Sequence, residues 1–367
     1  MVICAYGTGM STTTQTLRLL DEHGQRIASP EYDPFVAALT SGELRDLYRD
    51  LVVVRRLDAE ATALQRQGEL ALWPPLLGQE AAQIGSARAL RDDDFVFSSY
   101  REHAVAWVRG VSLQDLVRTW RGAALSGWDP YEHGMATPQV IIGAQSLHAT
   151  GYAMGIRQDG SDAAAITYFG DGATSEGDVS EALVFAASFR APVLFFCQNN
   201  QWAISEPVGL QSTVPIADRA SGFGIPAIRV DGNDVLAVLA ATRAALARIR
   251  AGEGPMFVEA VTYRMGPHTT ADDPTRYRDA AELASWRDRD PLARLATHLR
   301  DAGVLDDAEE AAVQEEAAEA AAELRAGCLA IADPEPLSIF DHVYAGPHAE
   351  LDRQRAEYAD YLRGFTS

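Results

Sequence analysis

The chain has 367 residues and a formal net charge of −21, with 31 Lys and Arg residues against 52 Asp and Glu residues. This length allows one large α/β domain or two small ones, and the negative charge argues against nucleic acid or an anionic membrane as a partner. No apolar run reaches transmembrane length, and the N-terminus is too short and lacks the basic flank of a signal peptide. The three scattered cysteines (Cys4, Cys197 and Cys328) are typical of reduced thiols, so a cytoplasmic protein is expected.

The N-terminal region is predicted to be a polar arm followed by a long helix. Residues 1–40 have the composition of an arm interrupted by Pro breakers, and Met10 is a second candidate for the natural start. Thr40 and Glu43 have the spacing of a capping box and are predicted to open a helix that runs to Gln67. Its leucines and valines recur at helical spacing, which indicates a packing face.

Three further elements are predicted before the centre of the chain. The segment LLGQEAAQIG opens a helix over about 76–90, and FVFSSYR (Phe95–Arg101) is typical of a short strand. Gln145–Arg157 is rich in Gly and Ala, which favours a helix packed closely against another element or another subunit.

The central stretch is predicted to be one strand–helix–strand unit. Ala163–Phe169 and Val193–Cys197 are short apolar runs typical of buried strands, and Val179–Phe189 between them is typical of a helix. Ser175 and Asp178 have capping-box spacing, so we expect the helix to start there.

Polar residues follow both strands of this unit. Asp171 comes after the first strand and Asn199 and Asn200 come after the second, and ligands bind at the carboxyl ends of parallel strands. Magnesium prefers oxygen ligands and is usually held by few protein groups together with phosphate oxygens and water. Asp171, Asn200 and the backbone carbonyl of Trp202 are therefore predicted to hold a metal that carries a diphosphate.

The alternative for this stretch is a dinucleotide site. Gly170-x-Gly172 with Gly177 downstream weakly resembles the glycine-rich fingerprint of nicotinamide-binding proteins. That fingerprint requires an acidic residue after the second strand, to bind a ribose hydroxyl. The sequence has Gln198, Asn199 and Asn200 there, which favours the metal–diphosphate interpretation.

The second half is predicted to continue the same alternation and then to become helical. Strands are expected over Ile225–Val230 and Pro255–Arg264, with a helix over Val235–Arg250 that Asn233 or Asp234 can cap. This order predicts a doubly wound, mainly parallel sheet flanked by helices. The charges of Asp306–Arg325 are predicted to form a solvated helical face.

The GDG turn, the helix, the strand and the NN pair together resemble the diphosphate–magnesium motif of thiamin-diphosphate enzymes. From about Leu44 to the C-terminal tail the sequence is similar to the alpha subunit of the decarboxylating component of 2-oxo acid dehydrogenase complexes. LLGQEAAQIG is similar to the family's GQEAVQVG, and YRMGPHTTADD is similar to its YRxGHHSxSDD. The resemblance implies a thiamin-diphosphate-binding fold with helical N- and C-terminal extensions, divided at 1–40, 41–300 and 301–367.

The resemblance also implies cofactors and site residues. Thiamin diphosphate and magnesium are the expected cofactors, with the metal on Asp171, Asn200 and Trp202. Arginine suits phosphate because its planar fork donates two hydrogen bonds at once, whereas an isolated Tyr-Arg pair is more often an ordinary surface feature. The other residues implied are Tyr100 and Arg101 at the diphosphate, Gly172 and Ala173 as backbone contacts, and Ile142 beneath the bent cofactor.

His268 follows a predicted strand in a polar loop, where an imidazole that titrates near neutrality can transfer a proton. A lone loop histidine is more often incidental, but the resemblance implies that His268 is the active-site histidine, in contact with the cofactor and active in acyl transfer. Thr269 stands where animal relatives carry a phosphorylated serine.

The resemblance implies oxidative decarboxylation of a 2-oxo acid and transfer of the acyl group to a lipoyl-bearing acyltransferase. It implies a beta subunit, in a heterotetramer of two alpha and two beta chains. The segment RVDGNDV (229–235) and the histidine loop are closer to the branched-chain type than to the pyruvate type. Pyruvate or acetoin remain alternative substrates, and a nicotinamide-binding oxidoreductase is the alternative of another class.

Overall fold

The computed structural model describes residues 15–124 and 126–365 of the chain. Its helices are α1 (Ser41–Arg66), α2 (Glu80–Ala87), α3 (His103–Val108), α4 (Leu113–Arg121), α5 (Pro130–His133), α6 (Ala144–Gln158), α7 (Gly177–Phe189), α8 (Val208–Gln211), α9 (Ile216–Ser221), α10 (Val235–Arg250), α11 (Ala280–Arg287), α12 (Pro291–Asp301), α13 (Asp307–Ala330) and α14 (Ala349–Arg363). The strands are β1 (Phe95–Phe97), β2 (Ala165–Gly170), β3 (Val193–Asn199), β4 (Trp202–Ala203), β5 (Glu206–Pro207), β6 (Ala227–Asp231) and β7 (Met256–Val261). Short 3-10 turns lie at η1 (Asp33–Phe35), η2 (Asp171–Ser175), η3 (Pro274–Arg276) and η4 (Pro336–Phe340).

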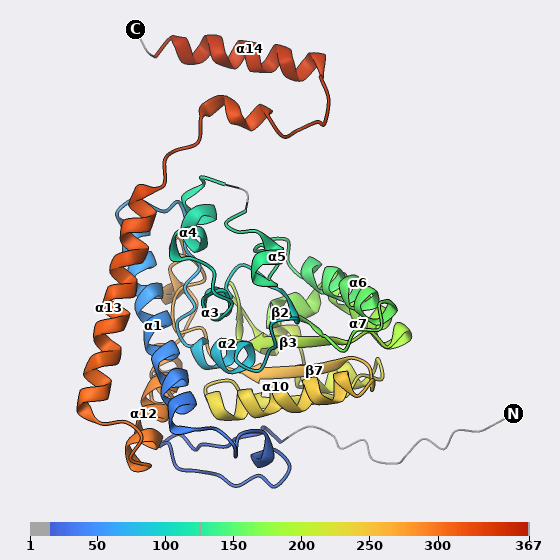
Figure 1. Ribbon diagram of the computed structural model, residues 1–367, viewed down its shortest axis with the longest axis vertical. Helices are drawn as coiled ribbons and strands as arrows, with labels where there is room; N and C mark the ends of the chain where they lie inside the picture. Colours follow the sequence, from blue (N-terminus) through green and yellow to red (C-terminus); the bar gives the residue numbers. More distant parts are fainter. Residues whose placement is uncertain (1–14, 125, 366–367) are drawn as a thin grey trace, which may run out of the picture.

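The predicted α/β fold is confirmed. Strands β1, β2, β3, β7 and β6 form, in that spatial order, one sheet in which every neighbouring pair is parallel. Figure 1 shows α6 and α7 on one side of this sheet and α10 with α1 and α2 on the other. Such a sheet is buried on both faces, which is why its strands are continuous apolar runs.

Alternation along the strands divides the core into two parts. Ile166 and Tyr168 of β2 pack with the α1, α2 and α10 side, whereas Ala165 and Phe169 pack with the α6 and α7 side. Successive side chains of a strand point to opposite faces, so each strand supplies both cores.

The N-terminal segment is joined to the sheet. The amide of Leu17 donates to the Arg229 carbonyl at 2.8 Å, and the amide of Asp231 donates to the Leu17 carbonyl at 2.9 Å, so this segment continues the sheet beyond β6. Residues 1–14 lie outside the described residues. They include Cys4, Met10 and the first part of the predicted arm.

Some predicted boundaries are wrong. The predicted capping box at Ser175 and Asp178 is absent, because the chain leaves β2 through η2 and α7 starts at Gly177 without a side-chain cap. Strand β1 ends at Phe97, so Tyr100 and Arg101 lie in the loop before α3. The cap of α1 by Thr40 and Glu43 and that of α10 by Asp234 are confirmed.

Helix α13 is more than a solvated helix. Ala317, Ala320, Ala321 and Leu324 are buried in its contact with α1, which runs beside it in Figure 1. Helix α14, by contrast, extends away from the body of the molecule (Figure 1). No helix among the described residues combines the length and apolar character needed to cross a bilayer.

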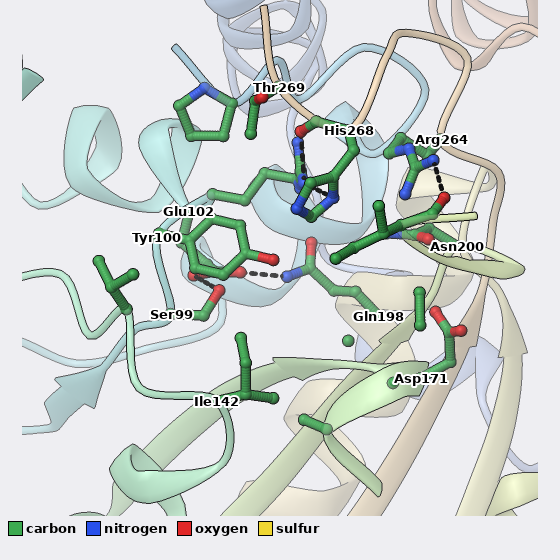
Figure 2. Close-up of a pocket in the computed structure, with 18 of the residues that line it drawn as sticks. Ser99, Tyr100, Glu102, Ile142, Asp171, Gln198, Asn200, Arg264, His268 and Thr269 are labelled. Carbon is green, nitrogen blue, oxygen red and sulfur yellow. Dashed lines mark hydrogen bonds between the residues drawn. The ribbon is translucent and has the colours of Figure 1, made fainter. Parts of the chain in front are cut away.

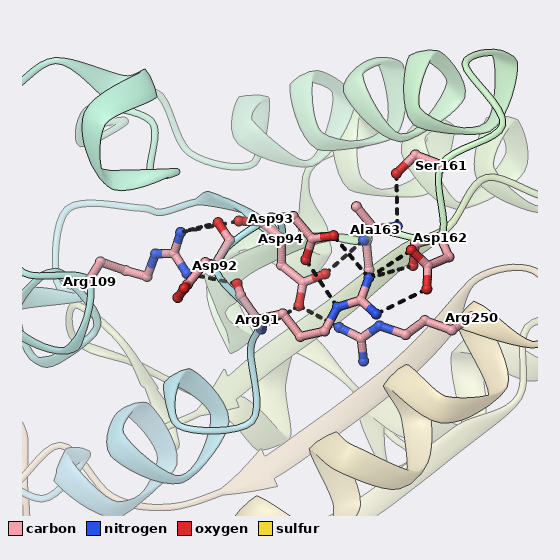
Figure 3. Close-up of polar contacts among 10 residues, drawn as sticks. Arg91, Asp92, Asp93, Asp94, Arg109, Ser161, Asp162, Ala163 and Arg250 are labelled. Atoms are coloured by element: carbon pink, nitrogen blue, oxygen red, sulfur yellow. Dashed lines mark hydrogen bonds and ion pairs between the residues drawn. The ribbon is translucent and has the colours of Figure 1, made fainter.

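A network of charged groups ties together the amino ends of the first two strands (Figure 3). The buried Asp94 carboxylate, just before β1, accepts from the Ala164 amide at 2.8 Å, the Arg91 amide at 2.8 Å and Nη2 of Arg250 at 2.5 Å. Arg91 in turn pairs with Asp162 at 3.0 Å. The network joins the α2–β1 loop, the α6–β2 loop and the end of α10. It lies at the amino ends of the strands, on the far side of the sheet from their carboxyl ends.

Candidate active site

A cavity of about 420 Å³ lies at the carboxyl ends of β2 and β3. Figure 2 shows it with Tyr100 on one side and Asp171 and Asn200 on the other. The structure brings all of the predicted site residues to its lining, namely Tyr100, Arg101, Ile142, Asp171, Gly172, Ala173, Asn200, Trp202 and His268. Segments separated by more than 150 residues in sequence thus meet at one place.

Asp171 is a buried carboxylate that has no ion pair within the described part of the chain. Strand β2 places it at the cavity, where it is 1% exposed, and its Oδ2 accepts from Nε2 of Gln211 at 3.2 Å. Burial raises the pKa of this carboxyl to about 6, with hydrogen bonds and the more distant Arg264 opposing the rise. A cation bound here would remove the cost of burying the charge.

Asn200 and Trp202 follow β3 and lie in one tight turn. Oδ1 of Asn200 accepts from the backbone amide of Trp202 at 3.2 Å, and Nδ2 donates to Oε1 of Gln79 at 3.1 Å. The Trp202 carbonyl is not free, because it accepts from Nη1 of Arg264 at 2.9 Å. A carbonyl oxygen has two lone pairs, so a second partner can bind there.

Arg101 and Arg264 bring positive charge to the cavity. Arg101 is 5% exposed and donates to the carbonyls of Pro75 at 2.6 Å and His268 at 3.0 Å, while Arg264 is fully buried. Burial, together with Arg101, lowers the pKa of Arg264 to about 10. Within the described ranges neither arginine forms a salt bridge with a carboxylate, so the lining holds two buried cations that lack a counter-anion.

His268 lies on the loop after β7, in edge contact with the Tyr100 ring at a centroid distance of 6.0 Å. Nη2 of Arg101 lies 3.3 Å from Nδ1 of His268; arginine can only donate, so Nδ1 accepts and Nε2 carries the proton of the neutral ring. Burial, with Arg101 and Arg264 adding to it, lowers the pKa of His268 to about 4. The loop is held by Asp272, which accepts from the His268 amide at 2.8 Å and from the Tyr277 hydroxyl at 2.5 Å.

Small residues leave room where the chain turns at the cavity. A Cβ added to Gly172 would lie 2.6 Å from Cβ of Ala203, so any larger residue would displace the β4 turn. Ile142, in the loop before α6, is 41% exposed at the cavity, and its neighbours Val140 and Ile141 are 63% and 67% exposed.

Sequence reasoning missed several polar side chains of the lining, among them Gln79, Glu102 and Gln198. Gln79 directly precedes α2, Glu102 follows Arg101, and Gln198 is the next-to-last residue of β3. Glu102 accepts from the Ser99 hydroxyl at 2.7 Å and from Nε2 of Gln198 at 2.6 Å, and burial raises its pKa. Their positions within LLGQEA, YRE and CQNN were the available signal, since each is adjacent to a motif residue.

The charges of the cavity fit a metal ion that carries an anion. A carboxylate and two arginines that form no ion pair within the described part of the chain lie in the same lining, and such groups are stabilised when each is paired. No three His, Cys, Asp or Glu side chains among the described residues are arranged to hold a metal. A metal here would therefore depend on amide, carbonyl and ligand oxygens besides Asp171.

Residues 48–327 match the family described as "Dehydrogenase E1 component". The chain is 46% identical over 358 residues to the 3-methyl-2-oxobutanoate dehydrogenase subunit alpha of Mycobacterium tuberculosis (strain ATCC 25618 / H37Rv), which covers 96% of this chain and 97% of the relative. It is 41% identical over 305 residues to the pyruvate dehydrogenase E1 component subunit alpha of Staphylococcus epidermidis (strain ATCC 12228 / FDA PCI 1200), which covers 83% of this chain and 81% of the relative. The protein of the same name from Staphylococcus aureus (strain COL) is 40% identical over the same shares of the two chains.

Proposed function

The chain belongs to the dehydrogenase E1 component family, and from this premise we propose that it is the alpha subunit of a thiamin-diphosphate- and magnesium-dependent 2-oxo acid dehydrogenase. The reaction is the oxidative decarboxylation of a 2-oxo acid, with transfer of the acyl group to a lipoyl group. One observation carries the proposal: a single cavity holds the buried carboxylate of Asp171 and the buried arginines Arg101 and Arg264, none of which forms an ion pair with another described residue.

The proposed substrates are branched-chain 2-oxo acids. The similarity to the 3-methyl-2-oxobutanoate dehydrogenase alpha subunit is higher and longer, at 46% over 96% of the chain, than that to the pyruvate dehydrogenase alpha subunit, at 41% over 83%. Pyruvate is the second candidate, because these similarities differ by little.

The metal is assigned to Asp171, Asn200 and the Trp202 carbonyl, which lie at the ends of neighbouring strands. The negatively charged diphosphate is assigned to the positively charged residues of the cavity, with Arg101 as the hydrogen-bond donor beside Tyr100. When bound, thiamin diphosphate supplies the electron sink for the decarboxylation.

The remaining site residues are proposed to position the cofactor and to act on the substrate. The tight turn at Gly172 and Ala173 offers backbone contacts, and Ile142 supports the cofactor from below. His268 is neutral at pH 7 because its pKa is lowered to about 4, so its Nε2–H can donate to an oxygen of the substrate or the acyl acceptor.

A beta subunit is the proposed partner, in a heterotetramer of two alpha and two beta chains, with a lipoyl-bearing acyltransferase as the next component. The names of the relatives as alpha subunits support a second chain. Exposed apolar side chains near the cavity support a covered surface there: Val140, Ile141 and Ile204 in loops and Leu210 in α8. Cys197 and Cys328 are free and buried, which supports the cytoplasm as the proposed location.

The test uses this chain copurified with its beta subunit, an artificial electron acceptor, thiamin diphosphate and magnesium. We expect a higher kcat/KM for 3-methyl-2-oxobutanoate than for pyruvate. A preference for pyruvate would refute the substrate assignment and leave the site assignment intact. No cofactor-dependent turnover of either acid would refute both.

A further inference from the structure

The start of α2 is held firmly against the segment that follows β7. Gly78 has φ +96°, and a Cβ there would lie 2.2 Å from the Tyr263 carbonyl oxygen. Its own carbonyl accepts from the Thr262 hydroxyl at 2.6 Å. Glu80 secures the turn, because its carboxylate accepts from the Gly78 amide at 2.9 Å and from Nε of Arg55 at 2.8 Å. Gln79, between Gly78 and Glu80, is therefore fixed in place.

The hydrogen bonds around Asn200 determine which way the Gln79 amide faces. The Trp202 backbone amide can only donate, so the Asn200 atom 3.2 Å from it is the oxygen Oδ1. The amide nitrogen Nδ2 of Asn200 then faces Gln79 at 3.1 Å, and the Gln79 atom that accepts from it is Oε1. The nitrogen Nε2 of Gln79 takes no part in either of these hydrogen bonds.

Nε2 of Gln79 is buried and has no hydrogen-bond partner among the residues that the structure describes, although Gln79 is only 1% exposed and lines the cavity. Burying an unpaired donor is unfavourable, so a ligand with an acceptor oxygen would be held there. Arg101 and Arg264 line the same cavity and attract an anion. A diphosphate oxygen can accept the hydrogen bond of Nε2, and it belongs to an anion that the two arginines attract.

We propose that Gln79 is a further binding and positioning residue of this site. Its Oε1 orients the Asn200 amide so that Oδ1 lies on the side of Trp202, whose carbonyl is the other neutral metal ligand assigned above. Its Nε2 donates a hydrogen bond to a diphosphate oxygen. The proposal rests on the proposed function, since it takes thiamin diphosphate with magnesium as the ligand.

Two variants separate these roles in the chain copurified with its beta subunit. Gln79→Glu keeps an acceptor toward Asn200, removes the donor and adds a negative charge; Gln79→Met has similar length and removes both donor and acceptor. Gln158→Glu is the control, because it makes the same change of amide to carboxylate on an exposed side chain at the end of α6 that does not line the cavity.

Calorimetric titration with thiamin diphosphate in excess Mg²⁺ gives the Kd of each protein. We expect Kd to rise about 10- to 100-fold in both Gln79 variants and to stay within about 2-fold in Gln158→Glu. In Gln79→Met the Mg²⁺ concentration needed for half-maximal binding also rises, since Asn200 is no longer oriented. In steady-state assays the cofactor KM rises, while kcat at saturating cofactor remains near that of the wild type.

Melting of the cofactor-free proteins shows whether each variant is folded, and either Gln79 variant alone decides the question. Folded Gln79 variants with a Kd within about 3-fold of the wild type would overturn the proposal. So would a loss of kcat at saturating cofactor with an unchanged cofactor KM. A wild-type protein that binds no thiamin diphosphate would instead refute the proposed function, and this inference with it.

Discussion

The charged network at the amino ends of the strands leads to a prediction about stability that does not involve the cavity. Asp94→Ala removes a fully buried carboxylate that receives three hydrogen bonds, two from backbone amides and one from Arg250. The change leaves the Arg250 guanidinium, whose side chain is 19% exposed, without its carboxylate.

The size of the effect follows from these contacts. Breaking a buried ion pair by removing one partner costs about 3–5 kcal/mol. An unfolding entropy of about 2.1 cal/mol/K per residue amounts to about 0.8 kcal/mol/K for 367 residues. A loss of about 4 kcal/mol therefore lowers Tm by about 5 °C.

Differential scanning calorimetry of the wild type, Asp94→Ala and Asp93→Ala tests this reasoning. Asp93 is the control, since its side chain is 55% exposed and it pairs with Arg91 alone among the described residues. We expect Asp93→Ala to cost less than about 1 kcal/mol, as surface ion pairs do. Equal shifts in the two variants would refute the assignment of the stability to the buried carboxylate.

Three further predictions concern the site and its surroundings. Asp171→Ala should abolish magnesium-dependent binding of thiamin diphosphate in calorimetry while the beta subunit still copurifies; binding that survives would remove Asp171 from the metal site. Gly172→Ala places a methyl group 2.6 Å from Cβ of Ala203. Overpacking of about 1.4 kcal/mol or more should therefore raise the cofactor Kd about tenfold. An unchanged Kd would contradict the close approach of Gly172 to Ala203. Burial lowers the pKa of His103 from 6.5 to about 3, so the unfolded state binds the extra proton and stability is lost as pH falls below about 6.5. At about pH 5 this loss amounts to about 2 kcal/mol, and denaturant unfolding of His103→Gln should show a pH dependence flatter by that amount; parallel curves would refute it.

The fold was largely predictable, because its strands and helices correspond to apolar residues that recur with a regular spacing in the sequence. The strands before and after Asp171 are short and apolar on both faces, as a parallel sheet requires, and the strand–helix alternation allows few other arrangements. Boundaries set by local hydrogen bonds were not predictable. Ser175 belongs to the η2 turn and α7 starts at Gly177, so the capping box predicted at Ser175 and Asp178 ahead of Val179–Phe189 does not form, and no pattern of side chains in the sequence predicts this turn.

The members of the site were predictable where the residue type itself carries the chemistry. Asp171, Asn200 and Arg101 follow strand ends and have the oxygen ligands and the planar cation that a metal diphosphate needs. The Arg264 bond to the Trp202 carbonyl depends on a contact between segments about 60 residues apart, and so does not appear in any local pattern. Gln79 and Glu102 were missed for the same reason, since their burial is a property of the packed structure.

The placement of the C-terminal third shows another limit. The boundary drawn at residue 300 remains a prediction, and it falls inside α12, which ends at Asp301. Alanine-rich α13 looked solvated because its charges are many, but small side chains on one face let it pack closely on α1.

We propose that one cavity of this chain binds a metal diphosphate between Asp171 and Arg101. The decisive experiment is calorimetric titration of the chain and its beta subunit with thiamin diphosphate, first with Mg²⁺ and then after a chelator has removed it. We expect saturable binding of one cofactor per alpha chain, and we expect this binding to be lost when Mg²⁺ is removed. Absence of binding, or binding of equal strength without the metal, would contradict it.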